Sequence, residues 1–233
     1  MSDKSYLSVY AKSFSWAGFF LPKETLKKCS ILYDFCRVAD NIADDKDEIE
    51  VKEKVEINSK KELLIYSYRV AGTVGLMMAK ILNVTKKNSL KSAIDLGIAM
   101  QLTNISRDVL EDSENNRFYI EKNFEKISST VNLANRYYQD SFYAIKSIPI
   151  SFRFSILVAR RVYRKIGYKI LKKKNLENYQ RSGKIHVSNI EKVLETFLSI
   201  FDLISLYLIN KKEDQIQHDH ILINEEINLN ERI

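Results

Sequence analysis

The stretch QLTNISRDVLED, residues 101–112, decides the fold of this chain. At about 100° per residue on a helix, Gln101, Asn104, Asp108 and Asp112 fall on one narrow polar stripe. Apolar residues flank that stripe: Ile98, Leu102, Ile105 and Val109 on one side, and Leu96, Met100 and Leu110 on the other. A helix that is apolar on most of its surface is buried in a globular protein. The stretch therefore predicts a buried helix at the centre of an all-α domain.

The two carboxylates of this stripe lie one turn apart, because positions i and i+4 share a helix face. Buried carboxylates are costly unless they are paired or bind a metal, so a water-facing surface explains them poorly. Two such groups can share hard divalent cations such as Mg²⁺, with Mn²⁺ as an alternative, because these ions prefer oxygen ligands. Gly97 and Ala93 continue the stripe, and we expect them to leave room for a hydrocarbon chain.

A second acidic pair with the same spacing, Asp40 and Asp44, lies in CRVADNIAD, residues 36–44. On a helix it shares a face with Arg37 and Tyr33. The neighbouring positions are also polar: Asp34, Asn41 and Asp45. One broad polar face turned toward water therefore remains an alternative for this helix. If the two acidic pairs face each other, they form a cage for a phosphate-bearing substrate.

Such a cage suits the ionisation of an allylic diphosphate. Metal ions held by carboxylates neutralise the leaving diphosphate, and Arg37 and Arg107 can add charge-assisted hydrogen bonds. The carbocation that remains must be kept from water, which a helical bundle lined by apolar side chains can do. Aromatic rings can stabilise that cation, and the chain has 13 Tyr and 11 Phe.

Composition bounds the remaining possibilities. With 233 residues, 45% hydrophobic residues, 6 Gly and 2 Pro, the chain is long enough for one helical domain and too short to require two. The net charge is +7, but the basic residues do not form a stripe interleaved with aromatic residues. Nucleic-acid binding is therefore not expected. Cys29 and Cys36 fit a reduced protein, and residues 1–14 lack the apolar segment of a signal peptide. We therefore expect a cytoplasmic protein.

The chain divides into a helical domain, residues 1–210, and a polar tail, residues 211–233. The expected helices cover residues 5–19, 23–45, 62–82, 89–112, 131–148, 150–173 and 188–210, with Ser188 as an N-cap and Glu191 three residues on. Residues 46–61 are charged throughout and are expected to be a linker or a solvated helix start. Residues 113–127 are expected to be a loop, and His186, His218 and His220 are expected on the surface.

Two segments suggest a peripheral location at the inner face of the membrane. Residues 193–209 are the most apolar late stretch, but they contain Glu195 and Asp202 and are short for a membrane span. We expect a buried helix there, with a helix lying on the membrane as the alternative. The basic run RKIGYKILKKK, residues 164–174, is either a solvated face or a contact with anionic lipid.

Four segments together resemble the squalene/phytoene synthase family, and most of all its phytoene synthase branch. They are KSFSWAGFFLP (12–22), YDFCRVADNIADD (33–45), YSYRVAGTVGLMM (66–78) and DLGIAMQLTNISRDVLEDSENNRFYI (95–120). A weaker match covers residues 158–193. The resemblance implies a single-domain, isoprenoid-synthase-like helical bundle around a central cavity.

The resemblance also implies an activity. It is the Mg²⁺-dependent, head-to-head condensation of two geranylgeranyl diphosphates to phytoene through a cyclopropylcarbinyl diphosphate intermediate, without NADPH. One alternative is a synthase that makes squalene or presqualene diphosphate from farnesyl diphosphate. Another is a catalytically inactive relative with a binding or assembly role. In the family a long helical stretch separates the first aspartate motif from the AGTVG segment, whereas this chain has only residues 46–61 between them.

The resemblance assigns roles to individual residues. Asp40 and Asp44 match the first aspartate motif, and Asp108 and Asp112 match the second, so that all four are expected to act in catalysis and to bind metal. The positions that match residues assisting diphosphate or metal binding are Arg37, Gln101, Asn104 and Arg107, with Asn104 also a metal ligand. The other matches are Ser13, Ser15 and Tyr33 near the ionising diphosphate, Tyr66 near the reacting carbons, the RxY pair Arg117 and Tyr119, and a late arginine, Arg181.

Overall fold

The computed structural model describes residues 12–46, 54–208 and 219–224, without the side chains of residues 40–46 and 219. In chain order the elements are α2 (Lys12–Gly18), α3 (Lys23–Lys46), β1 (Val55–Glu56), α4 (Lys60–Ser67), the π-helix η1 (Tyr68–Gly72), α5 (Thr73–Ile81), α6 (Lys87–Glu114), β2 (Arg117–Phe118), α7 (Phe124–Asp140), the 3₁₀-helix η2 (Tyr143–Ser147), α8 (Ile150–Leu171), α9 (Leu176–Arg181), α10 (Asn189–Leu208) and α11 (Asp219–Asn224). The predicted all-α class is confirmed.

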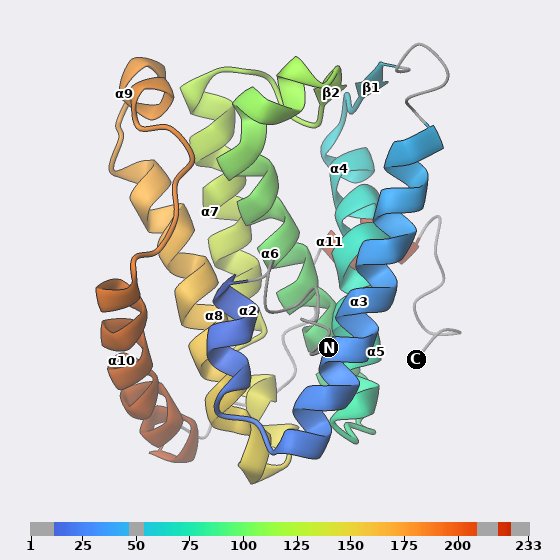
Figure 1. The fold of residues 1–233 in the computed structure, drawn as a ribbon, viewed down its shortest axis with the longest axis vertical. Coiled ribbons are helices and arrows are strands. Elements are labelled where there is room, and N and C mark those ends of the chain that lie inside the picture. The colour runs from blue at the N-terminus through green and yellow to red at the C-terminus, as the bar shows by residue number, and fades with distance from the viewer. Residues whose placement is uncertain (1–11, 47–53, 209–218, 225–233) are drawn as a thin grey trace, which may run out of the picture.

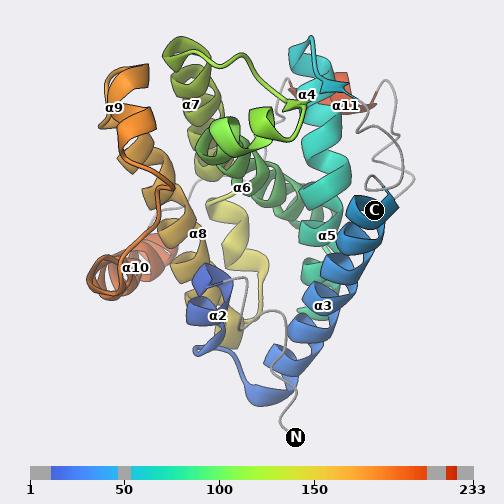
Figure 2. The same cartoon turned by 45° about the horizontal axis from the view of Figure 1, so that its top comes forward.

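Helix α6 runs through the middle of the bundle (Figures 1 and 2). Helices α7 and α8 pack against it, and the continuous segment α4–η1–α5 packs against another side. Ile94, Ile98 and Leu102 on α6 are fully buried. The prediction of a buried central helix around residues 101–112 is therefore confirmed, because α6 has apolar neighbours on most of its circumference.

Helices α5 and α6 approach each other so closely that their backbones touch. A Cβ atom on Gly75 would collide with the carbonyl oxygen of Ala93, and one on Gly97 would collide with that of Ala71. The expectation that Gly97 and Ala93 leave room for a hydrocarbon chain is therefore wrong. The backbone of η1 and α5 fills that space.

The helix expected over residues 62–82 is interrupted by the π-helix η1. Ser59 caps its start, since the Ser59 hydroxyl accepts a hydrogen bond from the Glu62 backbone N–H at 3.1 Å. π-helical turns inside α-helices are frequent at functional sites, and η1 begins two residues after Tyr66.

Part of the expected linker forms a strand. Strands β1 and β2 pair in parallel, with Val55 opposite Arg117 and Glu56 opposite Phe118. This pairing ties the segment after α3 to the turn after α6, near the second aspartate motif (Figure 1). The expectation of a plain linker or helix start at residues 54–57 is wrong for this reason.

The C-terminal part departs from expectation in two places. Helix α10 is not simply buried, because Phe197, Phe201 and Leu208 are 62%, 66% and 78% exposed. Helix α11 lies within the expected tail, and its His220 is buried beside Asp95 of α6, with 2.5 Å between Nε2 and Oδ1. His220 is therefore not a surface residue as expected. No helix in the described part of the chain combines the length and apolar composition that spanning a bilayer requires.

Candidate active site

Asp108 lies near the C-terminal end of α6 and forms an ion pair with the adjacent Arg107. Arg107 donates from Nε to Oδ1 at 2.8 Å and from Nη2 to Oδ2 at 2.5 Å. Lys184, in the segment after α9, reaches Oδ1 at 3.6 Å. Burial alone would lower the pKa of Arg107, but the hydrogen bond and charge of Asp108 outweigh it and raise that pKa. The carboxylate is therefore paired, as its low exposure requires.

Asp112 lies one turn further along α6 and is less well compensated. Burial raises its pKa, the charges of Asp108 and Glu111 raise it further, and Arg117 and Lys184 only partly offset them, so that the pKa is about 6. Unfavourable burial and like-charge repulsion both disfavour the ionised form. A bound cation would relieve both effects.

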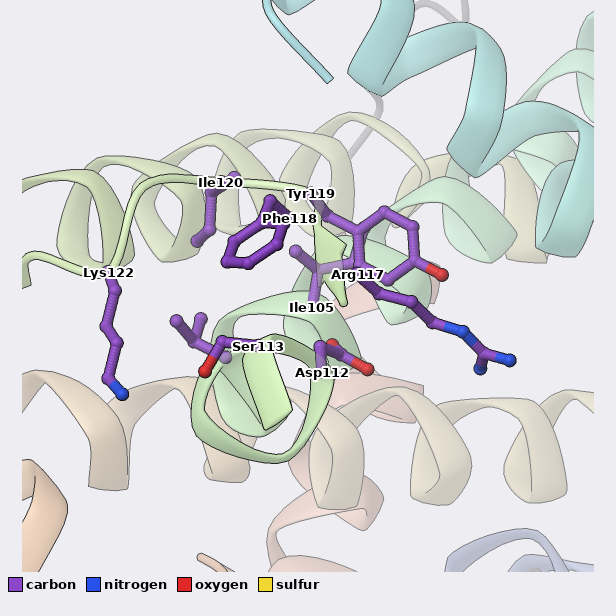
Figure 3. Close-up of a pocket in the computed structure, with 9 residues that line it drawn as sticks. Ile105, Asp112, Ser113, Arg117, Phe118, Tyr119, Ile120 and Lys122 are labelled. Carbon is purple, nitrogen blue, oxygen red and sulfur yellow. The ribbon is translucent and has the colours of Figure 1, made fainter. Parts of the chain in front are cut away.

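A stacked pair of tyrosines lies beside Asp112. The rings of Tyr66 and Tyr119 lie 4.7 Å apart, and the Tyr66 hydroxyl donates to the Tyr119 hydroxyl at 3.0 Å. Burial, the hydrogen bond and charge of Tyr119, and the charge of Asp112 raise the pKa of Tyr66 far above its usual range. Figure 3 shows the Asp112 carboxylate, the Arg117 guanidinium and the Tyr119 hydroxyl projecting to the same side.

The pocket drawn in Figure 3 is small. It lies between the end of α6 and the segment around β2, is lined by Asp112, Arg117 and Tyr119 among others, and has a volume of about 10 Å³. That is room for about one water molecule. A prenyl chain therefore does not fit this pocket as it stands.

The N-terminal helices reach the other side of Asp108. Tyr163 of α8 is buried, which raises its pKa to about 12, and its electrostatic neighbours are Arg107, Tyr33 and Asp108. The ring of Phe14 on α2 packs 4.8 Å from the ring of Tyr163. The structure thus brings Tyr33 of α3 close to the second aspartate motif. The other predicted residues on α2 and α3, Ser13, Ser15 and Arg37, are half-buried.

Asn104 has an unused oxygen on the same stripe. Its Oδ1 is buried and accepts no hydrogen bond from any described residue. A buried oxygen without a hydrogen bond is a candidate ligand for an ion or a water molecule. Asn104, Asp108 and Asp112 follow one another at one-turn intervals on α6. Gln101, one turn earlier, is half-buried. Amide and carboxylate oxygens are hard ligands that suit Mg²⁺, so this donor set fits the metal.

The first aspartate motif cannot be added to this geometry. Asp40 and Asp44 lie in α3, but their side chains are outside the described residues. Among the described residues, no group of three or more His, Cys, Asp and Glu side chains could hold a metal. The metal-binding role of the second motif and the convergence of both motifs therefore stay predictions.

Arg181 is the predicted site residue that the structure places apart. Its side chain is 75% exposed and pairs with Glu177 of the same helix at 2.6 Å. From the same segment, Lys184 is the cationic residue that reaches the second aspartate motif. Its ammonium contacts Glu111 at 2.5 Å as well as Asp108. The sequence offered a weak signal for Lys184, because it lies in the same RSGKIHVS segment as Arg181. Nothing in the sequence singled out Tyr163.

The second aspartate motif also lies in the part of the chain that known proteins share. Residues 52–123 match the family model described as squalene/phytoene synthase. The chain is 37% identical over 131 residues to a 15-cis-phytoene synthase of Enterobacter agglomerans, which is 47% of this chain and 44% of that enzyme. A phytoene synthase of Thermus thermophilus is 53% identical over 66 residues, 28% of this chain and 22% of that enzyme. Over these segments the chain is similar to the squalene and phytoene synthases.

The structural comparison agrees with this relationship at the level of the fold. A crystal structure of a dehydrosqualene synthase in complex with ligand superposes with a TM-score of 0.70 at 24% identity, covering 86% of this chain and 95% of that one. The chain spans less than half the length of the curated relatives it matches. The family match begins at residue 52 and so excludes Asp40 and Asp44.

Proposed function

We propose that this chain is a prenyltransferase that condenses two geranylgeranyl diphosphates head to head to phytoene with Mg²⁺. The observation that carries the proposal is the oxygen-rich stripe of Asn104, Asp108 and Asp112, which is surrounded by cationic side chains in a segment shared with phytoene synthases. The second motif thus combines ligands for a hard metal with partners for a diphosphate.

In this proposal Asn104, Asp108 and Asp112 hold the metal, with Asp40 and Asp44 facing them. Bound Mg²⁺ supplies positive charge against the leaving diphosphate. Arg107, Arg117 and Lys184 donate charge-assisted hydrogen bonds to its oxygens. Their positions around Asp108 and Asp112 support that role.

The two stacked tyrosines serve the hydrocarbon end of the reaction. The raised pKa of Tyr66 keeps its hydroxyl protonated well above neutral pH. Its ring, stacked on Tyr119, offers an aromatic face that stabilises a carbocation and excludes water. The pocket beside them, about 10 Å³, is too small to hold a prenyl chain.

Product analysis tests the proposal. Purified protein with Mg²⁺ and geranylgeranyl diphosphate, in detergent or lipid, is expected to release phytoene and two diphosphates for each phytoene. Consumption of farnesyl diphosphate alone would move the chain to the squalene-forming branch. The absence of turnover with either substrate, from protein that is folded, would favour an inactive relative with a binding role.

The substitution Asp108→Asn tests the second motif. We expect turnover to fall by about 10³-fold or more, because the metal that would neutralise the diphosphate loses a charged ligand. The fold should persist, since the amide can still accept one hydrogen bond from Arg107. The matched control is Asp140→Asn, the same change at a half-buried carboxyl at the C-terminal end of α7. Equal activity of both variants would remove Asp108 from the site.

A further inference from the structure

Helix α10 turns its charged side toward the protein. Lys192 and Glu195 are buried, and Asp202 accepts two hydrogen bonds from Arg161 of α8, both at 2.7 Å. Lys165 of α8 lies 3.1 Å from Glu195. Glu195 and Asp202 therefore hold α10 to α8, whereas the Lys192 ammonium lies 5.8 Å from the Trp16 ring of α2.

The opposite side of α10 is apolar and faces outward. Its exposed residues are Ile190, Val193, Leu194, Phe197, Ile200, Phe201, Ile204, Tyr207 and Leu208. At about 100° per residue they cover a single arc of roughly 140°, opposite Glu195 and Ser199, and no charged residue interrupts them. We call these nine residues the α10 ridge. A soluble surface helix shows the reverse pattern, and an exposed apolar patch of this kind marks an interaction site.

The ridge forms one edge of the molecule. Helix α10 packs on α8 and lies at the far side of the bundle from α3 and α5 (Figures 1 and 2). The apolar surface extends toward α2, because the Trp16 indole donates to Thr196 at 3.0 Å and Trp16 packs against Phe19, which is 78% exposed. A broad, flat partner can therefore contact the ridge without obstruction from α3.

A basic pocket borders the ridge. It has a volume of about 290 Å³ and lies between α8 and α10, where four cationic side chains meet two carboxylates: Arg160, Arg161, Arg164 and Lys165 with Glu195 and Asp202. Ser205, which also lines the pocket, is only about 40° around the helix from Phe201 of the ridge. The excess of positive charge lies at the flank of an apolar surface, and this pairing matches an anionic lipid headgroup above acyl chains.

We propose that α10 is an interfacial helix that docks the protein on an anionic phospholipid bilayer, with the ridge in the acyl-chain boundary and a lipid phosphate in the α8–α10 pocket. A second copy of the chain is the weaker occupant, because two copies that each carry a net charge of +7 repel each other, whereas an anionic bilayer attracts that charge. The residues of the ridge and the pocket are not those of the proposed active site.

Vesicle sedimentation tests the docking without measuring turnover, so its failure is separate from failure of the proposed function. The full chain is expected to bind vesicles that contain phosphatidylglycerol. Binding should be weaker with pure phosphatidylcholine vesicles, and weaker at high salt because salt screens the charges. The double variant Phe197→Ser/Phe201→Ser should lower the partition coefficient about tenfold or more. The matched control is Phe35→Ser, the same change at an equally exposed phenylalanine on α3. An equal loss in this control would overturn the proposal.

The charge of the pocket is tested by Arg164→Gln/Lys165→Gln against Lys27→Gln/Lys28→Gln on α3, which removes two exposed charges elsewhere. Only the pocket variant should lose its preference for phosphatidylglycerol; equal losses would show general charge attraction and overturn the pocket assignment. Circular dichroism confirms that each variant is folded. Light scattering without lipid measures the mass, and a dimer that the Phe197/Phe201 variant dissociates would assign the ridge to a second copy and overturn lipid docking.

Discussion

Gly97 lies where two helix backbones meet, directly above the polar stripe of α6. Its Cα hydrogens face the carbonyl of Ala71, and Gly75 faces the carbonyl of Ala93 in the same crossing. The crossing fixes the distance between α6, which carries Asp108, and the segment that carries Tyr66. Two small residues therefore set the spacing between the carboxylates and the stacked tyrosines.

The substitution Gly97→Ala should destabilise the protein by about 1–3 kcal/mol. A backbone carbonyl cannot move aside as a side chain can, so η1, which contains Ala71, and α6 must separate. We expect the melting temperature to fall by roughly 2–12 °C, measured by scanning calorimetry.

Gly167→Ala on α8 is the control for this prediction. There a Cβ would meet Cγ1 of Val131 at 3.0 Å, the end of a side chain that can shift, while alanine favours the helix. Its melting temperature should change much less. Equal losses in the two variants would show that the backbone contact at Gly97 does not govern stability.

Single residues were predictable from sequence where one helix places them. The stripe from Gln101 to Asp112 was found because helical periodicity alone brings these positions together. Lys184 and Tyr163 were missed, since they reach Asp108 from other elements. Contacts between distant segments depend on packing that no local pattern encodes.

At the scale of elements, the start of α10 shows how one cap joins two helices. The Glu191 carboxylate accepts a hydrogen bond from the Ser188 backbone N–H at 2.8 Å and one from Lys169 of α8 at 2.7 Å. The Ser188 hydroxyl accepts in turn from the Glu191 N–H at 3.3 Å. The predicted N-cap is thus confirmed as a capping box.

This cap predicts a loss of stability in acid. Burial would raise the pKa of Glu191, but the hydrogen bonds from Lys169 and Ser188 outweigh it and lower the pKa from 4.5 to about 2. Because the folded pKa lies below the unfolded value, the contribution is fully present above pH 4.5 and is lost as the pH falls toward 2. We expect a loss of roughly 1–2 kcal/mol, seen in urea midpoints measured between pH 6 and about 2.5.

Glu191→Gln isolates this effect. The amide can keep the capping hydrogen bond but has no charge for Lys169. The variant should be less stable than the parent at pH 6, and the difference should shrink on acidification. A difference that stays constant with pH would assign the acid loss to other carboxyls.

Two long helices were predicted to within two residues, because their apolar repeats are long and regular: 23–45 against Lys23–Lys46 and 150–173 against Ile150–Leu171. The helix expected over 131–148 was misplaced, since α7 covers Phe124–Asp140 and begins within the expected loop. The short elements were not predicted. Strand β1 exists only through its pairing with β2, about sixty positions later, and α9 and α11 have six residues each. Elements of that length depend on tertiary contacts more than on propensity.

For the whole molecule, the packing around α6 is uneven. Helices α7 and α8 bury their inner faces against it, whereas α3 lies at the edge of the bundle (Figure 2). Among the described side chains of α3, residues 23–39, only Cys29 is buried, and Ile31 and Phe35 are 60% and 66% exposed. Residues 23–39 of the helix that carries the first aspartate motif are therefore held by few apolar contacts.

This unevenness predicts unequal protection from hydrogen exchange. Amides of α3 should exchange at least about tenfold faster than those of residues 94–109 of α6, because local opening of α3 exposes little buried surface. If both aspartate motifs bind one metal–diphosphate group, then adding Mg²⁺ with a non-reactive prenyl diphosphate analogue should slow exchange in both helices. Mass spectrometry of peptides from α3 and α6 measures both effects.

Two controls separate ligand binding from a general change in stability. The Asp108→Asn variant should lose the ligand-induced protection of α3, although Asp108 itself lies on α6, because the shared group no longer binds. The exposed apolar helix α10 should exchange equally with and without the soluble analogue. Protection of α6 with an unchanged α3 would show that the first motif does not close over the substrate, and the facing arrangement of the two aspartate motifs would then have to be abandoned.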